Sequence, residues 1–465
     1  MNANILEPVD KTKMIKVIIS VVIPIFIFLI PVTDVFTSDM RTFLALTAWM
    51  LLWAAFEITD LLVPSLLWPV LLIIWGIIPE TTIYSSWLSL VIPCCMAAMV
   101  LAAILQRIGL LERLTFWIVA KCGGSFNRTM YALYFACLIM SAVTFAGASI
   151  IIAALCYGMC KSLNMEGKEE AAITMMVGML GGSTVRMFIY QPLTAGLVLG
   201  SVKAIDPTFT FTVFELLKYN IPVLLYSLLM IFIFLRMAKT KNSSINGSKE
   251  YFWNAYLEKG AMTAVEKKGA VLLALLMIGI LTNPLHGIDG MAIFVIVACL
   301  AYCPGIHIGT SAEIKGLPIG TIFFISACMA IGSGCTATGL TELISGVCTP
   351  ILAMLDTKII LIGILLFGIV LNFLMTPMAM VAVFSGPMVA LCVGAGINPL
   401  ASVFTFLFST DMVFLPYEYV TFLIFFSFGM MSTWQFVKYH SVKNLLFLVF
   451  YGIIILPYWS LLGLI

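Results

Sequence analysis

Three charged side chains, Arg186, Asp411 and Glu418, stand inside long apolar stretches of the sequence. A charge at the centre of a membrane helix costs about 2.5 to 3.5 kcal/mol on insertion scales, so it needs a partner. A guanidinium binds a carboxylate through a rigid fork of two N–H donors. Arg186 is therefore predicted to bind an anionic ligand, or to form an internal ion pair with Asp411 or Glu418. The two alternatives are compatible, because a ligand that displaced Glu418 would leave that carboxylate free to take up a proton.

Groups suited to catalysis are sparse. The chain has 3 His and 12 Cys, without a Ser-His-Asp set or a nucleotide-binding loop. The histidines are scattered, and none lies near Cys156 and Cys160. We therefore expect no zinc site and no disulfide framework. We also expect no catalytic residues and no cofactor, so a membrane enzyme or a sensor is only the lesser alternative.

The composition excludes a soluble fold. The 465 residues are 62% hydrophobic and 10% charged, whereas soluble domains carry about 25% charged residues. A membrane-spanning helix takes about 20 predominantly apolar residues, and charge-free runs of that order recur from Val17 to Ile465. We predict an all-α polytopic membrane protein in contact with lipid. No basic patch is interleaved with aromatic residues, so no nucleic-acid partner is expected.

The distribution of basic residues predicts the orientation. Positions 236–268 hold seven basic and three acidic residues, and positions 11–16 hold three lysines. Further basic clusters lie between Arg107 and Arg128 and at Lys438 with Lys443, whereas the last run carries no charge. Basic loops stay in the cytoplasm. We predict about eleven crossings of a bacterial inner membrane, with the N-terminus cytoplasmic and the C-terminus outside.

One apolar segment is too long to be a single crossing. Residues 359–410 are 52 consecutive uncharged residues, which as one helix would reach about 78 Å against a hydrocarbon core of about 30 Å. Residues that break helices stand in its middle, at Asn372 and Thr376-Pro377, and at its end, near Asn398-Pro399. The chain is therefore predicted to turn back within the membrane.

A second segment, residues 129–160, repeats this pattern with 32 uncharged residues. Its middle, Thr144 to Ser149, is small and flexible, and basic residues flank both ends. Two ends on the same side of the membrane predict a re-entrant hairpin. The alternative is a pair of ordinary helices joined by a tight outer turn.

Each predicted hairpin is followed by a helix that polar and special residues interrupt. Irregular backbone at membrane depth is tolerated only where protein buries it or water reaches it, and paired interruptions in two halves point to the central site of a transporter. We therefore predict substrate contacts from Thr144, Gly147, Ser149, Ser183, Thr184, Arg186, Gln191, Thr376, Pro377, Thr410, Asp411 and Glu418. Candidate sodium ligands are Ser141, Gly182, Asn372 and Ser409. Each hydroxyl alone is equally consistent with packing between helices.

An internal repeat in the sequence indicates that the chain consists of two related halves. Cys95-Met96-Ala97 leading to a Gly-Leu-Leu-Glu stretch at residues 109–112 resembles Cys328-Met329-Ala330 leading to Gly-Leu-Thr-Glu at 339–342. We predict one transporter domain over residues 1–465, with inverted repeats at 41–236 and 269–465 and a cytoplasmic loop at 237–268. Inverted repeats suit alternating access.

The order of these elements, with Phe56-Glu57-Ile58-Thr59-Asp60, Gly181-Gly182 and the stretch from Gly429 to Lys438, resembles the divalent anion:sodium symporter family, solute carrier family 13, within the ion-transporter superfamily. The resemblance covers nearly the whole chain. It implies an elevator-type transporter, usually a homodimer, whose two hairpin tips carry Ser-Asn-Thr motifs that contact a substrate carboxylate and sodium. This chain has Phe145-Ala146-Gly147 and Met375-Thr376-Pro377 at those tips, so neither motif is present.

The expected function is secondary active transport of small organic anions resembling di- or tricarboxylates. The coupling ion is expected to be sodium or a proton. An anion exchanger, or a carrier of a different small solute, is the alternative within transport.

Overall fold

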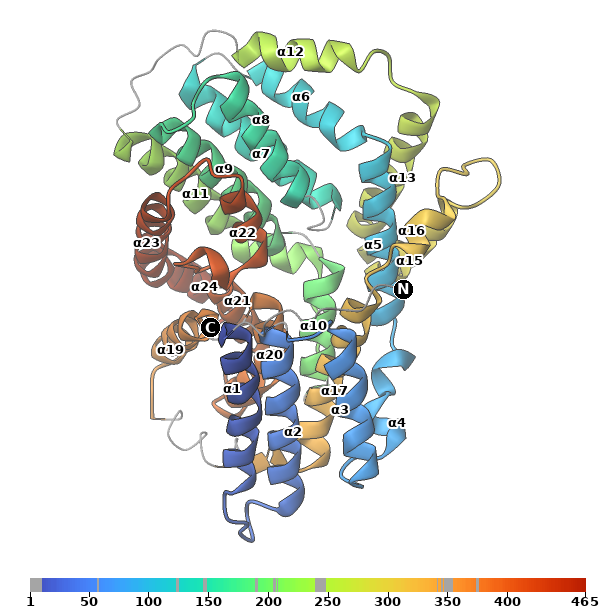
Figure 1. Cartoon of the computed structure of the whole chain (residues 1–465), viewed down its shortest axis with the longest axis vertical. Coiled ribbons are helices and arrows are strands. Elements are labelled where there is room, and N and C mark those ends of the chain that lie inside the picture. The colour runs from blue at the N-terminus through green and yellow to red at the C-terminus, as the bar shows by residue number, and fades with distance from the viewer. Residues whose placement is uncertain are drawn as a thin grey trace.

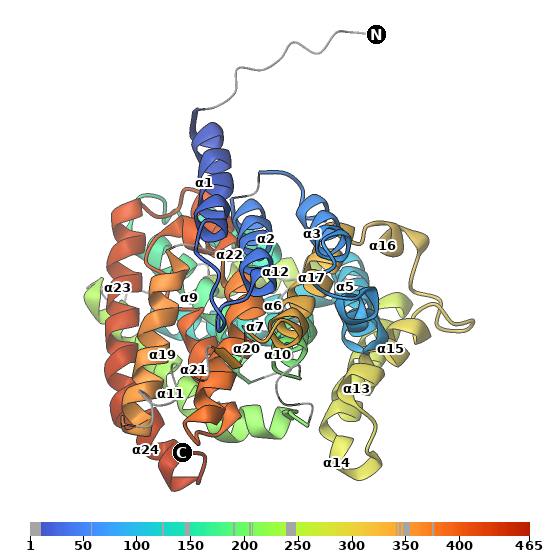
Figure 2. The same ribbon diagram turned by 90° about the horizontal axis from the view of Figure 1, so that it is seen from below.

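The computed structural model describes residues 11–465, except 57, 123–124, 145–148, 189–190, 204–205, 207, 239–247, 341, 344–345, 347–353 and 374–375. Every regular element in the described ranges is a helix, and the prediction of an all-α fold is confirmed. The two views in Figures 1 and 2 show these helices packed in one body, with α13 and α14 on the side of the molecule away from α23.

The first half of the chain is built from long helices joined by short turns. Its helices are α1 (Lys11–Phe28), α2 (Ser38–Ala55), α3 (Leu62–Ile74), α4 (Glu80–Ile83), η1 (Ser85–Leu88), α5 (Val91–Arg107), α6 (Leu110–Cys122), α7 (Phe126–Thr144), α8 (Ser149–Ser162), α9 (Glu169–Thr184), η2 (Val185–Met187), α10 (Pro192–Lys203) and α11 (Val213–Met237).

The remaining part of the chain begins with a short helix, α12, that packs along α6. Its helices are α12 (Ser248–Glu258), α13 (Ala264–Leu281), α14 (Asn283–His286), α15 (Gly290–Leu300), α16 (Ser311–Lys315), α17 (Ile319–Ala337), α19 (Thr357–Asn372), α20 (Pro377–Gly394), α21 (Pro399–Ser409), η3 (Pro416–Glu418), α22 (Val420–Ser427), α23 (Thr433–Phe450), the π-helical turn η4 (Tyr451–Ile455) and α24 (Leu456–Leu461).

Several of these helices suit a membrane. Four are long and apolar enough to cross one by length and composition, namely Val213–Met237, Ile319–Ala337, Pro377–Gly394 and Thr433–Leu461. Shorter apolar helices, among them α5, α8, α19 and α21, accompany them. The chain is thus a multi-pass membrane protein, as its composition predicts.

The α7–α8 pair, which we call the first hairpin, turns back on itself. Thr174, near the start of α9, approaches the sulfur atoms of both Met130 and Met165. Eight residues later on α9, a Cβ at Gly182 would lie 3.7 Å from both Ser141 and Ile152. Both arms therefore run beside α9 in opposite directions, with Met130 and Met165 near its start and Ser141 and Ile152 near its end. The predicted re-entrant hairpin and its alternative, a pair of ordinary helices, both require this antiparallel arrangement, so the choice between them stays a prediction.

The α19–α20 pair, the second hairpin, breaks where the sequence predicts. Helix α19 ends at Asn372, and α20 begins at Pro377, which suits the first turn because its missing N–H is not needed there. After Gly394, the side chain of Asn398 caps α21 by accepting a hydrogen bond from the N–H of Leu400. Both arms pack against α21.

Two helices are interrupted, as the sequence predicts. The first break lies between the end of α9 and the start of α10, and its described part contains the short helix η2. The second break spans residues 410–419, between α21 and α22, and contains η3. Ser141, near the end of α7, lies beside Gly182 just before the first break, and the amide of Asn372, at the end of α19, bonds Ser409 and Met412 at the second.

The two halves contact each other reciprocally. Helix α10, after the first break, packs on α20 of the second hairpin, and α22, after the second break, packs on α8 of the first hairpin. Helix α10 also lies very close to α5 and α17. A Cβ at Gly196 would lie 2.5 Å from Val91, and one at Gly200 would lie 2.2 Å from Met329, so only glycine allows these contacts.

Candidate functional site

An ion pair joins the two helix breaks. The guanidinium Nη2 of Arg186 lies 2.6 Å from Oδ1 of Asp411, and the two side chains are 10% and 18% exposed. Arg186 lies in η2 of the first break and Asp411 begins the second break, so residues 225 positions apart meet inside the protein. Of the two predicted internal partners of Arg186, the structure places Asp411 beside it.

Asp411 has further partners besides Arg186. The hydroxyl of Ser183 donates a hydrogen bond of 3.1 Å to its Oδ2. The ammonium of Lys443 lies 3.5 Å from the same oxygen and donates a 2.7 Å hydrogen bond to the main-chain oxygen of Asp411. The carboxylate of Asp411 therefore forms ion pairs with two cations. The cluster of Arg186, Asp411 and Lys443 carries a net charge of +1 (two positive, one negative) when all three side chains are ionised.

The position of Lys443 corrects the sequence analysis, which grouped it with Lys438 as a cytoplasmic basic cluster. The side chain of Lys443 is only 7% exposed, whereas that of Lys438 is 31% exposed and lies 3.8 Å from Glu169. The helix α23 begins at Thr433, next to the capping residue Ser432. Ten residues at 1.5 Å each place Lys443 about 15 Å along the helix, near the middle of a bilayer core. The capping pattern Ser-x-x-Gln was the signal that could have shown this.

Aromatic rings support both cations. The guanidinium carbon of Arg186 lies 5.0 Å from the centre of the Tyr419 ring, and Nζ of Lys443 lies 5.7 Å from that of Phe422. Aromatic faces attract cations within about 6 Å. Neither ring was predicted from the sequence, because nothing in the spacing of these two residues distinguishes them from the many aromatic residues of the hydrophobic core.

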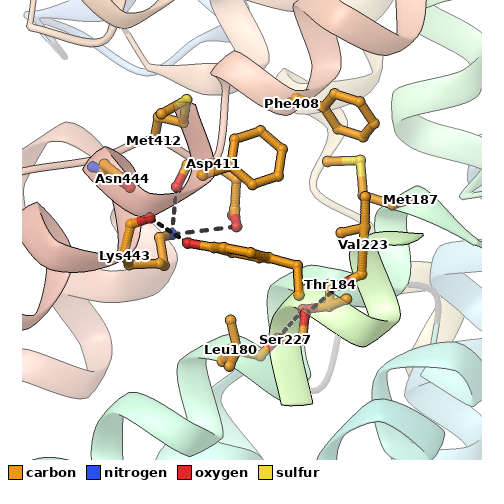
Figure 3. A pocket seen from close by; sticks show the side chains of 12 residues that line it. Leu180, Thr184, Met187, Val223, Ser227, Phe408, Asp411, Met412, Lys443 and Asn444 are labelled. Carbon is orange, nitrogen blue, oxygen red and sulfur yellow. Dashed lines mark hydrogen bonds and ion pairs between the residues drawn. The ribbon is translucent and has the colours of Figure 1, made fainter. Parts of the chain in front are cut away.

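A small cavity lies beside the cluster (Figure 3). Asp411 and Lys443 line one side and Thr184 and Ser227 another, with apolar side chains between them. The hydroxyls of Thr184 and Ser227 are 3.2 Å apart. The cavity measures about 30 Å³, which leaves room for a water molecule but not for an organic anion. The full lining is Leu180, Thr184, Met187, Val223, Tyr226, Ser227, Phe408, Asp411, Met412, Lys443, Asn444 and Phe447.

Glu418 has a local role in this structure. Its carboxylate oxygens accept hydrogen bonds from the main-chain N–H groups of Phe414 at 3.2 Å and Leu415 at 2.9 Å. The side chain is buried, with 2% of its surface exposed. Glu418 thus caps η3 and shapes the second break, and Asp411 takes the ion pair with Arg186.

The candidate sodium ligands meet as two pairs, one at each hairpin tip. In the first half, the Ser141 hydroxyl faces Gly182. In the second half, the amide of Asn372 donates to the main-chain oxygen of Ser409 at 2.7 Å. The other amide atom, Oδ1 of Asn372, is buried and has no hydrogen-bond partner among the residues that the structure describes.

The remaining predicted residues lie at the ends of helices or in the breaks. Thr410 caps the end of α21, and its hydroxyl donates to the main-chain oxygen of Leu407 at 2.7 Å. Gln191 is buried beside the start of α10, with a side-chain nitrogen that has no partner among the described residues. Thr376 precedes Pro377 at the start of α20, and Ser149 starts α8. Thr144 is the last residue of α7, and Gly147 lies outside the described residues, as do Phe145, Ala146 and Met375 of the hairpin tips.

Across the described ranges, no three His, Cys, Asp or Glu side chains gather in a way that could hold a metal ion. The polar atoms of the site come instead from hydroxyls, amides, main-chain groups and the charged cluster. Such a set can bind an anion at its cations, and its oxygens can bind an alkali cation.

Known proteins resemble this chain in family and in fold. A family model described as citrate transporter, CitMHS, matches residues 50–407. No curated protein sequence matches the chain. Among solved structures, the YdaH transporter of Alcanivorax borkumensis has a TM-score of 0.53 at 13% identity, covering 98% of this chain and 99% of its own. MtrF of Neisseria gonorrhoeae, described with a class of antimetabolite efflux pumps, has a TM-score of 0.50 at 13% identity, covering 97% and 95%.

Proposed function

The chain belongs to the CitMHS citrate transporter family, and we propose that it carries small di- or tricarboxylate anions, which bind at the cluster of Arg186, Asp411 and Lys443. Family membership makes it a secondary transporter and not an enzyme, and confirms the resemblance to the ion-transporter superfamily. The proposal rests on one observation: Arg186 and Lys443 both contact the carboxylate of Asp411, at the place where the two helix breaks meet.

The charge of the cluster favours an anion. Its net charge of +1 lies in a buried setting, where Coulomb interactions are stronger than in water. The N-terminus of α10, which follows the first break, adds the positive end of a helix dipole. A carboxylate entering this region would satisfy a charge that the protein leaves uncompensated.

Transport requires the site to open alternately to the two sides. We assign the moving unit to the two hairpins and the two broken helices, in an elevator or rocking motion. The reciprocal packing of α10 on α20 and of α22 on α8 supports inverted repeats at residues 41–236 and 269–465. In this assignment about eleven segments cross a bacterial inner membrane, with a cytoplasmic N-terminus, an external C-terminus and a homodimeric assembly.

Two coupling ions fit the site. Sodium would bind at the hairpin tips, where the unpartnered Oδ1 of Asn372 offers a ligand beside Ser409. A proton would bind at Glu418, whose present bonds come only from two main-chain N–H groups. Exchange of one anion for another is the alternative that needs neither ion.

The test is uptake into proteoliposomes, with sodium and proton gradients imposed separately and with labelled citrate, succinate and lactate. We expect citrate or succinate to enter faster than lactate and to be driven by one of the two gradients. Arg186→Gln is expected to reduce uptake at least tenfold, and Arg128→Gln, an exposed basic residue on α7, serves as the control. Uptake of none of these anions by the wild type would reject the proposal.

A further inference from the structure

Lys443 is the loosely held cation of the cluster. An ammonium group has three N–H donors, and its charge-assisted bonds to carboxylates are normally about 2.7 to 2.9 Å long. The short bond of Lys443, at 2.7 Å, goes to a neutral main-chain oxygen, and the carboxylate of Asp411 is 3.5 Å away. The positive charge of Lys443 is therefore only partly compensated.

Both cations have an aromatic ring and a main-chain oxygen nearby, but Arg186 is much closer to the carboxylate than Lys443 is. Arg186 lies 2.6 Å from the Asp411 carboxylate and 5.0 Å from the centre of the Tyr419 ring. Its Nε also approaches the main-chain oxygen of Ser183 at 3.5 Å. Releasing Arg186 would separate the two breaks, whereas releasing Lys443 from the carboxylate breaks one long contact.

The Asp411 carboxylate fills the space between the cations. Its two oxygens face Arg186 on one side and Ser183 with Lys443 on the other. The cavity beside it measures only about 30 Å³. In Figure 3 the side chains of Asp411 and Lys443 face each other at its edge. Since Asp411 and Lys443 both line this small cavity, an organic anion can bind Lys443 here only if lining side chains, the Asp411 carboxylate among them, move aside.

We propose that Lys443, rather than Arg186, contacts the carboxylate of the transported anion, and that Asp411 is a tethered carboxylate that partly neutralises Lys443 while the carrier is empty. On loading, the substrate carboxylate takes the ammonium of Lys443 and Asp411 keeps Arg186. The cluster then has two carboxylates for two cations. Arg186 is a positioning residue that holds the two breaks together. This inference rests on the proposed function.

The substrate contact of Lys443 and the positioning role of Arg186 can be tested separately, because each can be removed without leaving a lone carboxylate. Lys443→Gln leaves the neutral pair of Arg186 and Asp411, so no unpaired charge is buried. The double substitution Arg186→Gln with Asp411→Asn removes one charge of each sign and leaves Lys443 as the only cation. The first variant deletes the proposed anion contact and the second deletes the positioning pair.

The experiment compares uptake kinetics of labelled citrate and succinate by these variants in proteoliposomes. Lys443→Gln is expected to raise KM about tenfold to a hundredfold, as for loss of a hydrogen bond to a charged group, with a smaller change in maximal rate. The double variant is expected to keep KM within about threefold and to lose mainly maximal rate. Lys438→Gln, the same change on the same helix at a partly exposed position, is the control.

Two results would overturn the inference. One is an unchanged KM in Lys443→Gln, and the other is a rise in KM in the double variant as large as the rise in Lys443→Gln. If Lys443→Gln does not fold, the ratio of citrate to succinate uptake by Lys443→Arg tests the inference in its place. A substrate contact predicts that the fork of the guanidinium changes the ratio of citrate to succinate uptake, and an unchanged ratio contradicts it. Failure of the proposed function would already be visible in the wild type, as absence of uptake.

Discussion

Asn220 and Asn444 make the same bond in the two halves of the molecule. The side-chain amide of Asn220 on α11 donates to the main-chain oxygen of Met187 in the first break at 3.0 Å. The amide of Asn444 on α23 donates to the main-chain oxygen of Val413 in the second break at 2.8 Å. Each asparagine thus satisfies a carbonyl that lost its helical partner when the helix was interrupted.

These bonds predict that the two asparagines stabilise the breaks. Asn220→Ala or Asn444→Ala leaves a buried carbonyl unpaired, which costs about 1 to 3 kcal/mol. Thermal unfolding in detergent micelles should show a lower melting temperature for each variant. Asn254→Ala, at an exposed position on α12, should melt like the wild type. Equal melting temperatures for all four proteins would contradict the role given to these bonds.

Gly368 allows the second hairpin to approach α21. A Cβ at this position would lie 1.9 Å from Oγ of Ser409 and 2.4 Å from its Cβ. Gly368→Ala is therefore expected to destabilise the protein by about 1 to 3 kcal/mol through overpacking, and adding Ser409→Gly should recover part of the loss. Gly363→Ala, on the same helix with open space around it, is the matched control for melting temperature. A neutral Gly368→Ala would mean that α19 does not pack this closely.

Substitutions in the charged cluster should differ in severity according to the charge that they leave behind. Asp411→Asn leaves two neighbouring cations without a carboxylate, whereas Arg186→Gln leaves Asp411 with Lys443. Removing one partner of a buried ion pair costs about 3 to 5 kcal/mol, so Asp411→Asn should have the lowest melting temperature. The double variant should melt above Asp411→Asn. The reverse order would show that the two cations do not depend on this carboxylate.

The contacts of Glu313 with Arg107 and Thr310, which lie outside the apolar helices' interior, are expected to weaken in acid. Burial favours the neutral form of this carboxyl, but hydrogen bonds from Thr310 and Arg107 outweigh burial and lower its pKa from 4.5 to about 2. The folded pKa is below the unfolded one, so its stabilisation is complete above about pH 4.5 and is lost as the pH falls toward 2. Glu313→Gln should therefore lower the melting temperature by a few degrees at pH 6 and by less at pH 3. A difference that grows toward pH 3 would contradict this sign.

The breaks and hairpins could be predicted from the sequence because they follow from local rules. A 52-residue uncharged segment must fold back within a bilayer, and Asn372, Pro377 and Asn398 mark the ends of helices. The internal pair of Arg186 with Asp411 was one of two predicted partnerships, because a lone buried charge requires a neighbour. These features depend on segment length and residue type alone.

The rest of the site depends on three-dimensional packing. Lys443 was grouped with an interfacial lysine because the start of α23, which the capping pair Ser432 and Gln435 marks, had not been placed. Glu418 was predicted beside the substrate, yet its closest polar groups are the N–H groups of its own turn. The boundaries of the two repeats and the ligand roles stay predictions, to be tested by the transport measurements above.

The bond between Arg186 and Asp411 also limits how the protein can deform. The ion pair joins the two interrupted helices at their breaks. A sliding movement of one of these helices along the other would have to break this ion pair, so such a movement costs free energy. The contact of α10 with α5 and α17 is built differently, because Gly196 and Gly200 bring bare backbone against the side chains of Val91 and Met329. A larger side chain at Gly196 or Gly200 would overlap with Val91 or Met329 and so hinder any movement of α10 against α5 and α17. Such a substitution would leave the ion pair of Arg186 with Asp411 unchanged.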